Sequence, residues 1–288
     1  MTKVHRDSSR FPVVRVTDGV VSHVIDDVAV ESPLEIRLVI GDAAARPTTG
    51  IVPEATEHPI SVTMRTPGHD TELALGFLLT EGIITSPEQV TRVRLCGNDS
   101  TVRVSIAPNV SVDLDRLKRH FYTSSSCGVC GKSAIDAVRV SIREPLDPQL
   151  PRMTSGVLVS LPDALRSAQQ VFDRTGGLHA SGLFTTAGKL IRMHEDVGRH
   201  NALDKLIGAQ WFDDESVFTE SILLVSGRVS FELVQKALVA GIAVLVAVGA
   251  PSSLAVQLAE THGMSLVGFV RNNRMNVYCG AHRITDVA

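Results

Sequence analysis

Apolar and polar residues alternate along the first third of the chain, and this period of two predicts short β-strands. We expect strands at residues 13–16, 34–40, 60–64 and 102–106. One helix interrupts them, with Asp70 as its predicted N-cap and an apolar face from Leu73 to Leu79 that ends before Gly82. The pattern predicts a small α+β domain at residues 1–120.

From residue 154 onward, continuous apolar strands alternate with amphipathic helices. Strands are expected at residues 222–225, 243–248 and 265–270, and helices at 163–174, 201–211, 231–240 and 253–262. The segments 179–185 and 189–193 predict a hairpin that turns at Ala187-Gly188. Buried strands separated by helices favour an α/β domain with a mostly parallel sheet covered by helices on both faces. We place it at residues 154–288.

Residues 121–153 are predicted to connect the two domains. Pro145, Pro148 and Pro151 follow one another too closely for any regular element. The connector also carries the chain's most distinctive motif, a pair of cysteines.

Composition narrows the class of protein. The chain is 44% hydrophobic but only 4% aromatic, so its core must be aliphatic. A net charge of −3 argues against a strongly basic nucleic-acid binder. Four cysteines in 288 residues form no disulfide framework, which indicates a reducing compartment. No apolar run is long enough for a membrane span and no signal core is seen, so we expect a cytoplasmic protein that binds neither membrane nor nucleic acid.

The cysteine motif indicates sulfur chemistry. Cys127 and Cys130 each precede a glycine, three serines run into the motif, and Lys132 follows it. The glycines give the backbone freedom, and a nearby lysine favours the thiolate form of either cysteine. A thiolate that attacks or carries sulfur, with a second thiol within reach, suits such a loop.

The cysteine pair fits three other kinds of site less well. A zinc site needs two more ligands, but Cys96 and Cys279 are isolated, so we predict no bound metal. A thioredoxin-like centre would follow a strand and open a helix, whereas residues 117–122 do not form a strand core. Two buried structural cysteines fit poorly among glycines and serines. A sulfur-handling or redox loop is favoured.

A second polar cluster lies in the predicted α/β domain. It comprises His179, His194, Glu195, Asp196, Arg199, His200 and Asn201. Three histidines among acids suit a metal site or acid–base chemistry. Histidines with structural hydrogen bonds, next to a helix capped by Asp196, explain the pattern about equally well. The role of these histidines stays open.

Two strand-end segments suggest a phosphate-bearing ligand. They are Ser226-Gly227-Arg228 and Phe269-Val270-Arg271-Asn272-Asn273-Arg274. Ligands of parallel α/β sheets lie beyond the carboxyl ends of the strands, where helix N-termini attract anions. Arginines there add fork-shaped donors that match phosphate. Asn272-Asn273 also fits a hairpin turn, and a turn that presents its flanking arginines satisfies both interpretations.

Four motifs together resemble the formate dehydrogenase accessory sulfurtransferases, the FdhD family. They are Ser-Ser-Cys-Gly-Val-Cys-Gly at 125–131, Thr-Gly-Gly-Leu-His-Ala-Ser-Gly-Leu-Phe at 175–184, Glu-Asp-Val-Gly-Arg-His-Asn-Ala-Leu-Asp-Lys at 195–205 and Ser-Gly-Arg-Val-Ser-Phe-Glu at 226–232. The resemblance covers nearly the whole chain. It implies a cytidine-deaminase-like fold for the larger domain, a homodimer and a site for a guanine nucleotide such as GDP.

The resemblance also implies a function. Such a protein takes persulfide sulfur from a cysteine desulfurase and passes it to the molybdenum bis-guanine-dinucleotide cofactor, which matures formate dehydrogenase. Carried over to this chain, Cys127 is the persulfide bearer and Cys130 its partner. Residues 269–274 match the segment associated with cofactor binding, and Gly227 and Arg228 support it from the neighbouring strand end.

Two other functions are alternatives to sulfur transfer. Zinc deaminases use His-x-Glu followed later by Pro-Cys-x-x-Cys. Here the cysteine pair precedes His194-Glu195, the two residues are adjacent, and no proline precedes Cys127, so order and spacing both fail. A chaperone that only holds the cofactor is the stronger rival, and replacing the cysteines separates it from a sulfurtransferase.

Overall fold

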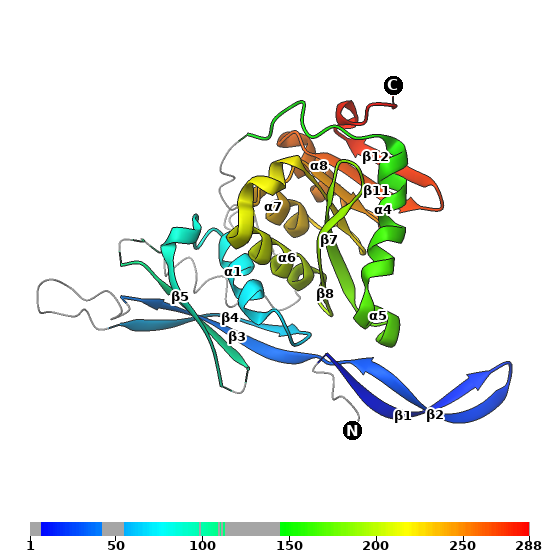
Figure 1. Ribbon diagram of the computed structural model, residues 1–288, viewed down its shortest axis with the longest axis horizontal. Helices are drawn as coiled ribbons and strands as arrows, with labels where there is room; N and C mark the ends of the chain where they lie inside the picture. The colour runs from blue at the N-terminus through cyan, green and yellow to red at the C-terminus, as the bar shows by residue number, and fades with distance from the viewer. Residues whose placement is uncertain are drawn as a thin grey trace, which may run out of the picture.

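The computed structural model describes residues 7–41, 55–97, 99–108, 110, 112 and 145–287. These residues form three sheets and the helices around them (Figure 1). The N-terminal elements are β1 (Ser8–Thr17), β2 (Val20–Ala29), β3 (Ser32–Ile40), β4 (Thr56–Arg65), α1 (Asp70–Thr80), η1 (Pro87–Gln89), β5 (Val90–Cys96) and β6 (Thr101–Ile106). The C-terminal elements are α4 (Ser155–Ala168), α5 (Gln170–Thr175), β7 (His179–Thr185), β8 (Leu190–Asp196), α6 (Arg199–Asp214), η2 (Glu215–Glu220), β9 (Ser221–Val225), α7 (Phe231–Val239), β10 (Val244–Ala247), α8 (Ser253–Thr261), β11 (Ser265–Arg271), β12 (Arg274–Cys279) and η3 (Ala281–Arg283).

The largest sheet has six strands in the order β12-β11-β10-β9-β7-β8. Only β9, β10 and β11 run parallel, and β7, β8 and β12 pair antiparallel at the two sides. The prediction of a mostly parallel sheet is therefore wrong for the whole sheet and right for its centre. The sheet is mixed because the hairpins 179–196 and 265–279 add antiparallel partners that need no crossover helix.

Helices cover both faces of this sheet, as predicted. Alternate residues of β9 point to opposite sides. Ile222 and Leu224 pack with α4 on one face, and Leu223 and Val225 pack in the cluster that contains α6, α7 and α8. Figure 1 shows α4 on the opposite side of the sheet from α6 and α7. Aliphatic side chains dominate both layers, as the composition required.

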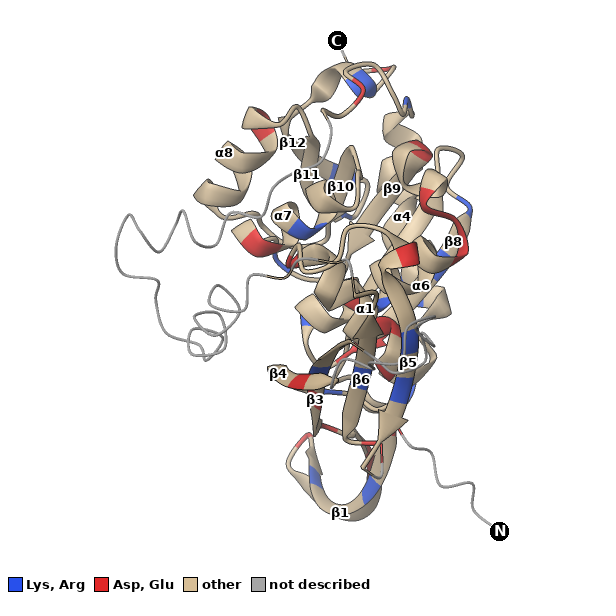
Figure 2. Cartoon of the chain, turned by 90° about the vertical axis from the view of Figure 1, so that its left-hand side faces the viewer, with Lys and Arg blue, Asp and Glu red and all other residues tan. Residues whose placement is uncertain are grey.

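The second sheet, in the order β4-β3-β6-β5, joins the larger one through α1 (Figure 2). Leu73 and Leu78 of α1 belong to the same apolar cluster as Leu34 of β3 and Leu203 of α6. The two halves of the described chain thus share one core. The domain limits at residues 120 and 153 stay a prediction, and residues 113–144 lie outside the described part.

Two predicted helix boundaries were wrong. The helix expected at 163–174 is two helices, of which α4 begins at Ser155 with Thr154 as its N-cap and α5 begins after Gln169. Asp70 does not cap α1, because its carboxylate binds the buried guanidinium of Arg65 at 2.7 Å and His69 occupies the cap position.

The third sheet is the hairpin of β1 and β2, of which only a strand at 13–16 was expected. Its turn is Asp18-Gly19, and both residues have positive φ (50° and 80°), the type I′ geometry that suits tight hairpins. The Asp-Gly pair between two valine-rich segments was a readable hairpin signal in the sequence.

Candidate functional site

The carboxyl ends of β9, β10 and β11 meet at one edge of the large sheet. Beyond the strands, the N–H of Gly249 donates to the carbonyl of Gly227 at 3.1 Å, and the N–H of Phe269 donates to that of Gly249 at 3.0 Å. The structure therefore brings the predicted Gly227 and Phe269 to the same edge, with Gly249 between them. Gly249 was missed, although the same strand-end rule applies to the residues that follow β10.

Glycine is required where these strand ends approach one another. A Cβ on Gly249 would lie 2.8 Å from the Gly227 carbonyl oxygen, and one on Gly227 would lie 3.3 Å from Nδ1 of His179. A larger side chain would therefore collide with the neighbouring backbone at Gly249 and crowd the His179 ring at Gly227. Close backbone approach to a ligand is one of the uses of glycine in such positions.

Phe269 adopts a conformation that bulky residues avoid. Its φ is 55°, and the register between β11 and β12 shifts between Gly268 and Arg271. A left-handed backbone at a bulky residue costs about 1–3 kcal/mol and is found mostly at functional sites. The strained residue lies within the segment for which cofactor binding was predicted.

The hairpin tip that follows confirms the turn expected at Asn272-Asn273. Both asparagines have positive φ (52° and 54°), and Arg271 pairs with Arg274 across the turn. All four residues are exposed, whereas the side chain of Val270 is buried in the core. Arg228, Arg271 and Arg274 form no ion pair with any other described residue.

The histidine cluster of the sequence divides into separate environments. His179 and His200 lie at the glycine-lined edge, where Nε2 of His200 is 2.8 Å from Glu232 and 3.3 Å from the Ser230 hydroxyl. Burial lowers the pKa of His179, and the charges of Arg199 and His200 lower it further. The hydrogen bond from His200 lowers the pKa of Glu232. These groups flank the N-termini of α6 and α7, neither of which has a side-chain cap.

The remaining members of the cluster have structural contacts. The ring of His194 packs edge-on against His69 with centroids 4.4 Å apart, and burial lowers its pKa to about 3. Glu195 accepts hydrogen bonds from the N–H groups of Val171 and Phe172 in the first turn of α5.

Asp196 does not cap α6 directly. It forms a buried ion pair with Lys205 at 2.7 Å and accepts a hydrogen bond from the N–H of the cap residue Gly198. Asn201 donates to Asp196 and to the carbonyl of Met64, which ties α6 to β4. His194, Glu195, Asp196 and Asn201 thus belong to the framework rather than to the sheet edge.

The structure does not test the cysteine motif. Cys127 and Cys130 lie outside the described residues, so their roles stay predictions. In the part of the chain that is described, Cys96 and Cys279 are free, and burial raises the pKa of Cys279. The described residues also contain no group of three or more His, Cys, Asp or Glu side chains able to hold a metal ion. Among them no helix is long and apolar enough to cross a membrane.

The fold and this edge define a mixed α/β protein. Its strand ends carry glycines, and three arginines with no ion-pair partner among the described residues lie where such proteins bind ligands. Comparison with known proteins gives the family. Residues 54–285 match the model of the FdhD/NarQ family, and the chain belongs to that family.

Similar proteins extend over nearly the whole chain. The sulfur carrier protein FdhD of Streptomyces coelicolor is 46% identical and covers 97% of this chain and 96% of its own length. The sulfur carrier protein FdhD of Sulfolobus acidocaldarius is 40% identical and covers 96% of this chain and 98% of its own. A crystal structure from Desulfotalea psychrophila, described as that of a formate dehydrogenase accessory protein, has 24% identity and a TM-score of 0.69. It covers 96% of this chain and 99% of its own, and it supports the fold.

Proposed function

We propose that this chain is a sulfur carrier that receives sulfur from a cysteine desulfurase as a persulfide on Cys127. It transfers that sulfur to the molybdenum bis-guanine-dinucleotide cofactor, its substrate, for the maturation of formate dehydrogenase. The observation that supports the proposal is sequence similarity to named relatives. Relatives that are 40–47% identical over almost the full chain bear the name sulfur carrier protein FdhD.

The sheet edge supports the cofactor part of the proposal. Gly227, Gly249 and Phe269 present backbone at the carboxyl ends of three parallel strands. Arg228, Arg271 and Arg274 supply exposed cations next to them. The cofactor carries several phosphates, which match guanidinium forks, and the exposed amides of Asn272 and Asn273 offer donors and acceptors for a guanine edge.

The proposed sulfur transfer requires two groups of this protein, the thiols of Cys127 and Cys130. The Cys127 thiolate attacks the terminal sulfur of the desulfurase persulfide, forming a new S–S bond and releasing the desulfurase thiolate. Attack of the Cys130 thiolate on the inner sulfur at Cys127 then forms a Cys127–Cys130 disulfide. This step releases the terminal sulfur as hydrosulfide. The hydrosulfide and one proton from solvent would then replace an oxo ligand of molybdenum, which leaves as water. A thiol reductant restores the two cysteines.

Maturation of formate dehydrogenase by cysteine variants tests this proposal. Cys127→Ala should abolish maturation, while Cys127→Ala and wild-type protein should bind GDP equally. Full maturation by the Cys127→Ala/Cys130→Ala variant would instead establish a chaperone that only holds the cofactor. Cys96→Ala serves as the matched control, because Cys96 lies on β5 and belongs to neither part of the proposed mechanism.

A further inference from the structure

The four-stranded sheet β4-β3-β6-β5 has one buried face and one exposed face. Leu34 and Ile36 of β3 are buried in the core that this sheet shares with α1. Successive residues of a strand point to opposite faces, so their neighbours in sequence lie on the other side of the sheet. On that outer face Arg103 is exposed, and Val62 and Met64 of β4 are 50% and 47% exposed. The described chain therefore leaves the outer face of this sheet open to a partner.

This outer face is positively charged, although the whole chain has a net charge of −3. The alternation of the four strands places four arginines and two glutamates on it: Arg37, Arg92, Arg94, Arg103, Glu35 and Glu57. Figure 2 shows the basic residues of β5 and β6 as blue bands on neighbouring strands.

Three of the arginines form a row across three neighbouring strands. Arg94 of β5 is directly opposite Arg103 of β6, and Arg103 is in register with Arg37 of β3. Like charges directly opposite one another destabilise a sheet. Glu57 relieves the repulsion between two of them, because it lies 2.9 Å from both Arg37 and Arg103. Arg92 and Arg94 form no ion pair with any other described residue, so the repulsion at β5 is available for a partner's carboxylates to neutralise.

The rest of the face indicates a protein partner rather than a nucleic acid. Glu35 and Glu57 stand among the arginines and would repel a phosphate backbone. Val62 and Met64 add exposed apolar surface, which apolar side chains of a protein can cover and phosphates cannot. A protein surface with carboxylates beside apolar side chains is complementary to both parts of the face.

We propose that this face binds an acidic surface of the cysteine desulfurase that supplies the sulfur, an inference that rests on the proposed function. The cofactor is assigned to the carboxyl edge of the large sheet, which leaves the small sheet for the sulfur donor. The segment that bears Cys127 follows β6, which ends at Ile106, directly along the chain. A desulfurase bound to this sheet therefore lies next to the start of the segment that carries its acceptor.

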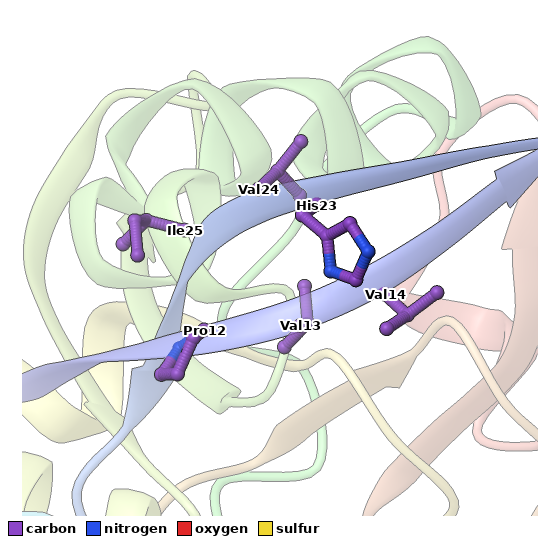
Figure 3. Close-up of a pocket in the computed structure, with 6 residues that line it drawn as sticks. All are labelled: Pro12, Val13, Val14, His23, Val24 and Ile25. Atoms are coloured by element: carbon purple, nitrogen blue, oxygen red, sulfur yellow. The ribbon is translucent and has the colours of Figure 1, made fainter.

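The β1–β2 hairpin is a second exposed sheet surface, but it lacks this positive charge. A shallow hollow on it is lined by Pro12, Val13, Val14, His23, Val24 and Ile25, of which only His23 is ionisable (Figure 3). The hairpin carries three aspartates and two arginines, and one of the arginines, Arg15, is already paired with Asp26 at 3.3 Å. It has no net positive charge for an acidic partner and therefore offers a position for a control substitution.

Charge reversal tests the proposed docking face. Arg92→Glu/Arg94→Glu should weaken binding of the cysteine desulfurase of the same organism about 10-fold in calorimetric titrations, and high salt should weaken wild-type binding in the same way. Arg10→Glu/Lys189→Glu makes the same change in net charge at exposed positions of the hairpin and of the β7–β8 turn, and should bind the desulfurase as the wild type does. The carboxylate introduced by Arg94→Glu lies opposite Arg103, so the first variant should melt at or above the wild-type temperature and bind GDP normally.

Three results would overturn the proposal: equal binding by all three proteins, equal weakening by both double variants, or no binding of the desulfurase by the wild type. Loss of affinity for a single-stranded RNA in Arg92→Glu/Arg94→Glu, with unchanged affinity for the desulfurase, would instead identify a nucleic-acid interface. Sulfur loading at saturating desulfurase measures the proposed function separately. A wild-type protein that binds the desulfurase through this face but gains no sulfur would refute the proposed function and leave the docking face standing.

Discussion

Buried and exposed cations have opposite roles in the two central regions of this molecule. Between α1, α6 and α7, Lys236 lies 3.0 Å from Asp204 and 3.2 Å from Glu81, and Lys205 lies 2.7 Å from Asp196. At the carboxyl edge of the large sheet, Arg228, Arg271 and Arg274 are exposed, with no ion-pair partner among the described residues. Burial demands a partner for every charge, so paired cations specify the framework and exposed ones are available to a ligand.

The largest effect is expected from breaking the buried network. Lys236→Met leaves Asp204 buried without its cation, which should lower the free energy of unfolding by about 3–5 kcal/mol in urea titrations. Burial raises the pKa of Asp204, so its carboxyl group takes up a proton more readily in the folded state than in the unfolded chain as the pH is lowered. The loss should therefore shrink as the pH is lowered and the carboxyl group takes up a proton. Lys189→Met, on the exposed hairpin turn, should change stability by less than about 0.5 kcal/mol.

A second substitution tests how closely α1 and α6 must approach. A Cβ on Gly76 would lie 1.9 Å from the backbone oxygen of Asp204, so Gly76→Ala forces the helices apart. We expect a loss of about 3 kcal/mol, the upper end for overpacked cores. Gly156→Ala in α4 meets no atom closer than 3.9 Å and should be neutral or stabilising. Equal melting temperatures of the two variants would show that the contact tolerates a methyl group.

At the sheet edge, substitution should change binding without changing stability. A charge-assisted hydrogen bond contributes about 1.5–3 kcal/mol, so Arg271→Ala and Arg274→Ala should each weaken GDP binding about 10- to 100-fold in calorimetric titrations. Arg94→Ala, on exposed β5, is the control and should bind GDP as the wild type does. Wild-type affinity for GDP in both Arg271→Ala and Arg274→Ala would place the nucleotide elsewhere. Arg228 would then be the first candidate to test, followed by Arg199 and His200.

The smallest effect concerns the pH dependence of the framework. Because the pKa of His194 is lowered from 6.5 to about 3, the folded protein keeps it neutral while the unfolded chain takes up a proton below pH 6.5. Wild-type stability should therefore fall on acidification. His194→Phe keeps an aromatic contact with His69 and should remove about 1.4 kcal/mol of the loss between pH 7.5 and pH 5.5. His282→Phe, at an exposed position, should keep the wild-type profile.

The sequence allowed the buried centre of the large sheet to be predicted well. The strands predicted at 222–225, 243–248 and 265–270 coincide with β9, β10 and β11. A short, continuously apolar strand is buried on both faces, which occurs in a sheet covered by helices on both sides. The same strands directed attention to Gly227 and residues 269–274. Gly249, which follows β10, could have been predicted in the same way.

Other features depended on contacts that no local pattern reveals. Asp70 looked like a helix cap, but the buried guanidinium of Arg65 binds it more strongly than the first turn of α1 does. Asp196, at the end of β8, forms an ion pair with Lys205 of α6, nine residues further along the chain. The β1–β2 hairpin itself could have been predicted from its Asp18-Gly19 turn, but alternation alone does not show that its valines are exposed.

The proposed function requires Cys127 to accept a sulfur atom, and intact mass after incubation with a cysteine desulfurase and cysteine shows whether it does. Wild-type protein and the Arg271→Ala/Arg274→Ala variant should each gain the mass of one sulfur atom, and a reductant should remove it. Cys127→Ala should gain none. A reducible sulfur on Cys127→Ala at the level of the wild type, or none on the wild-type protein, would show that Cys127 is not the sulfur carrier.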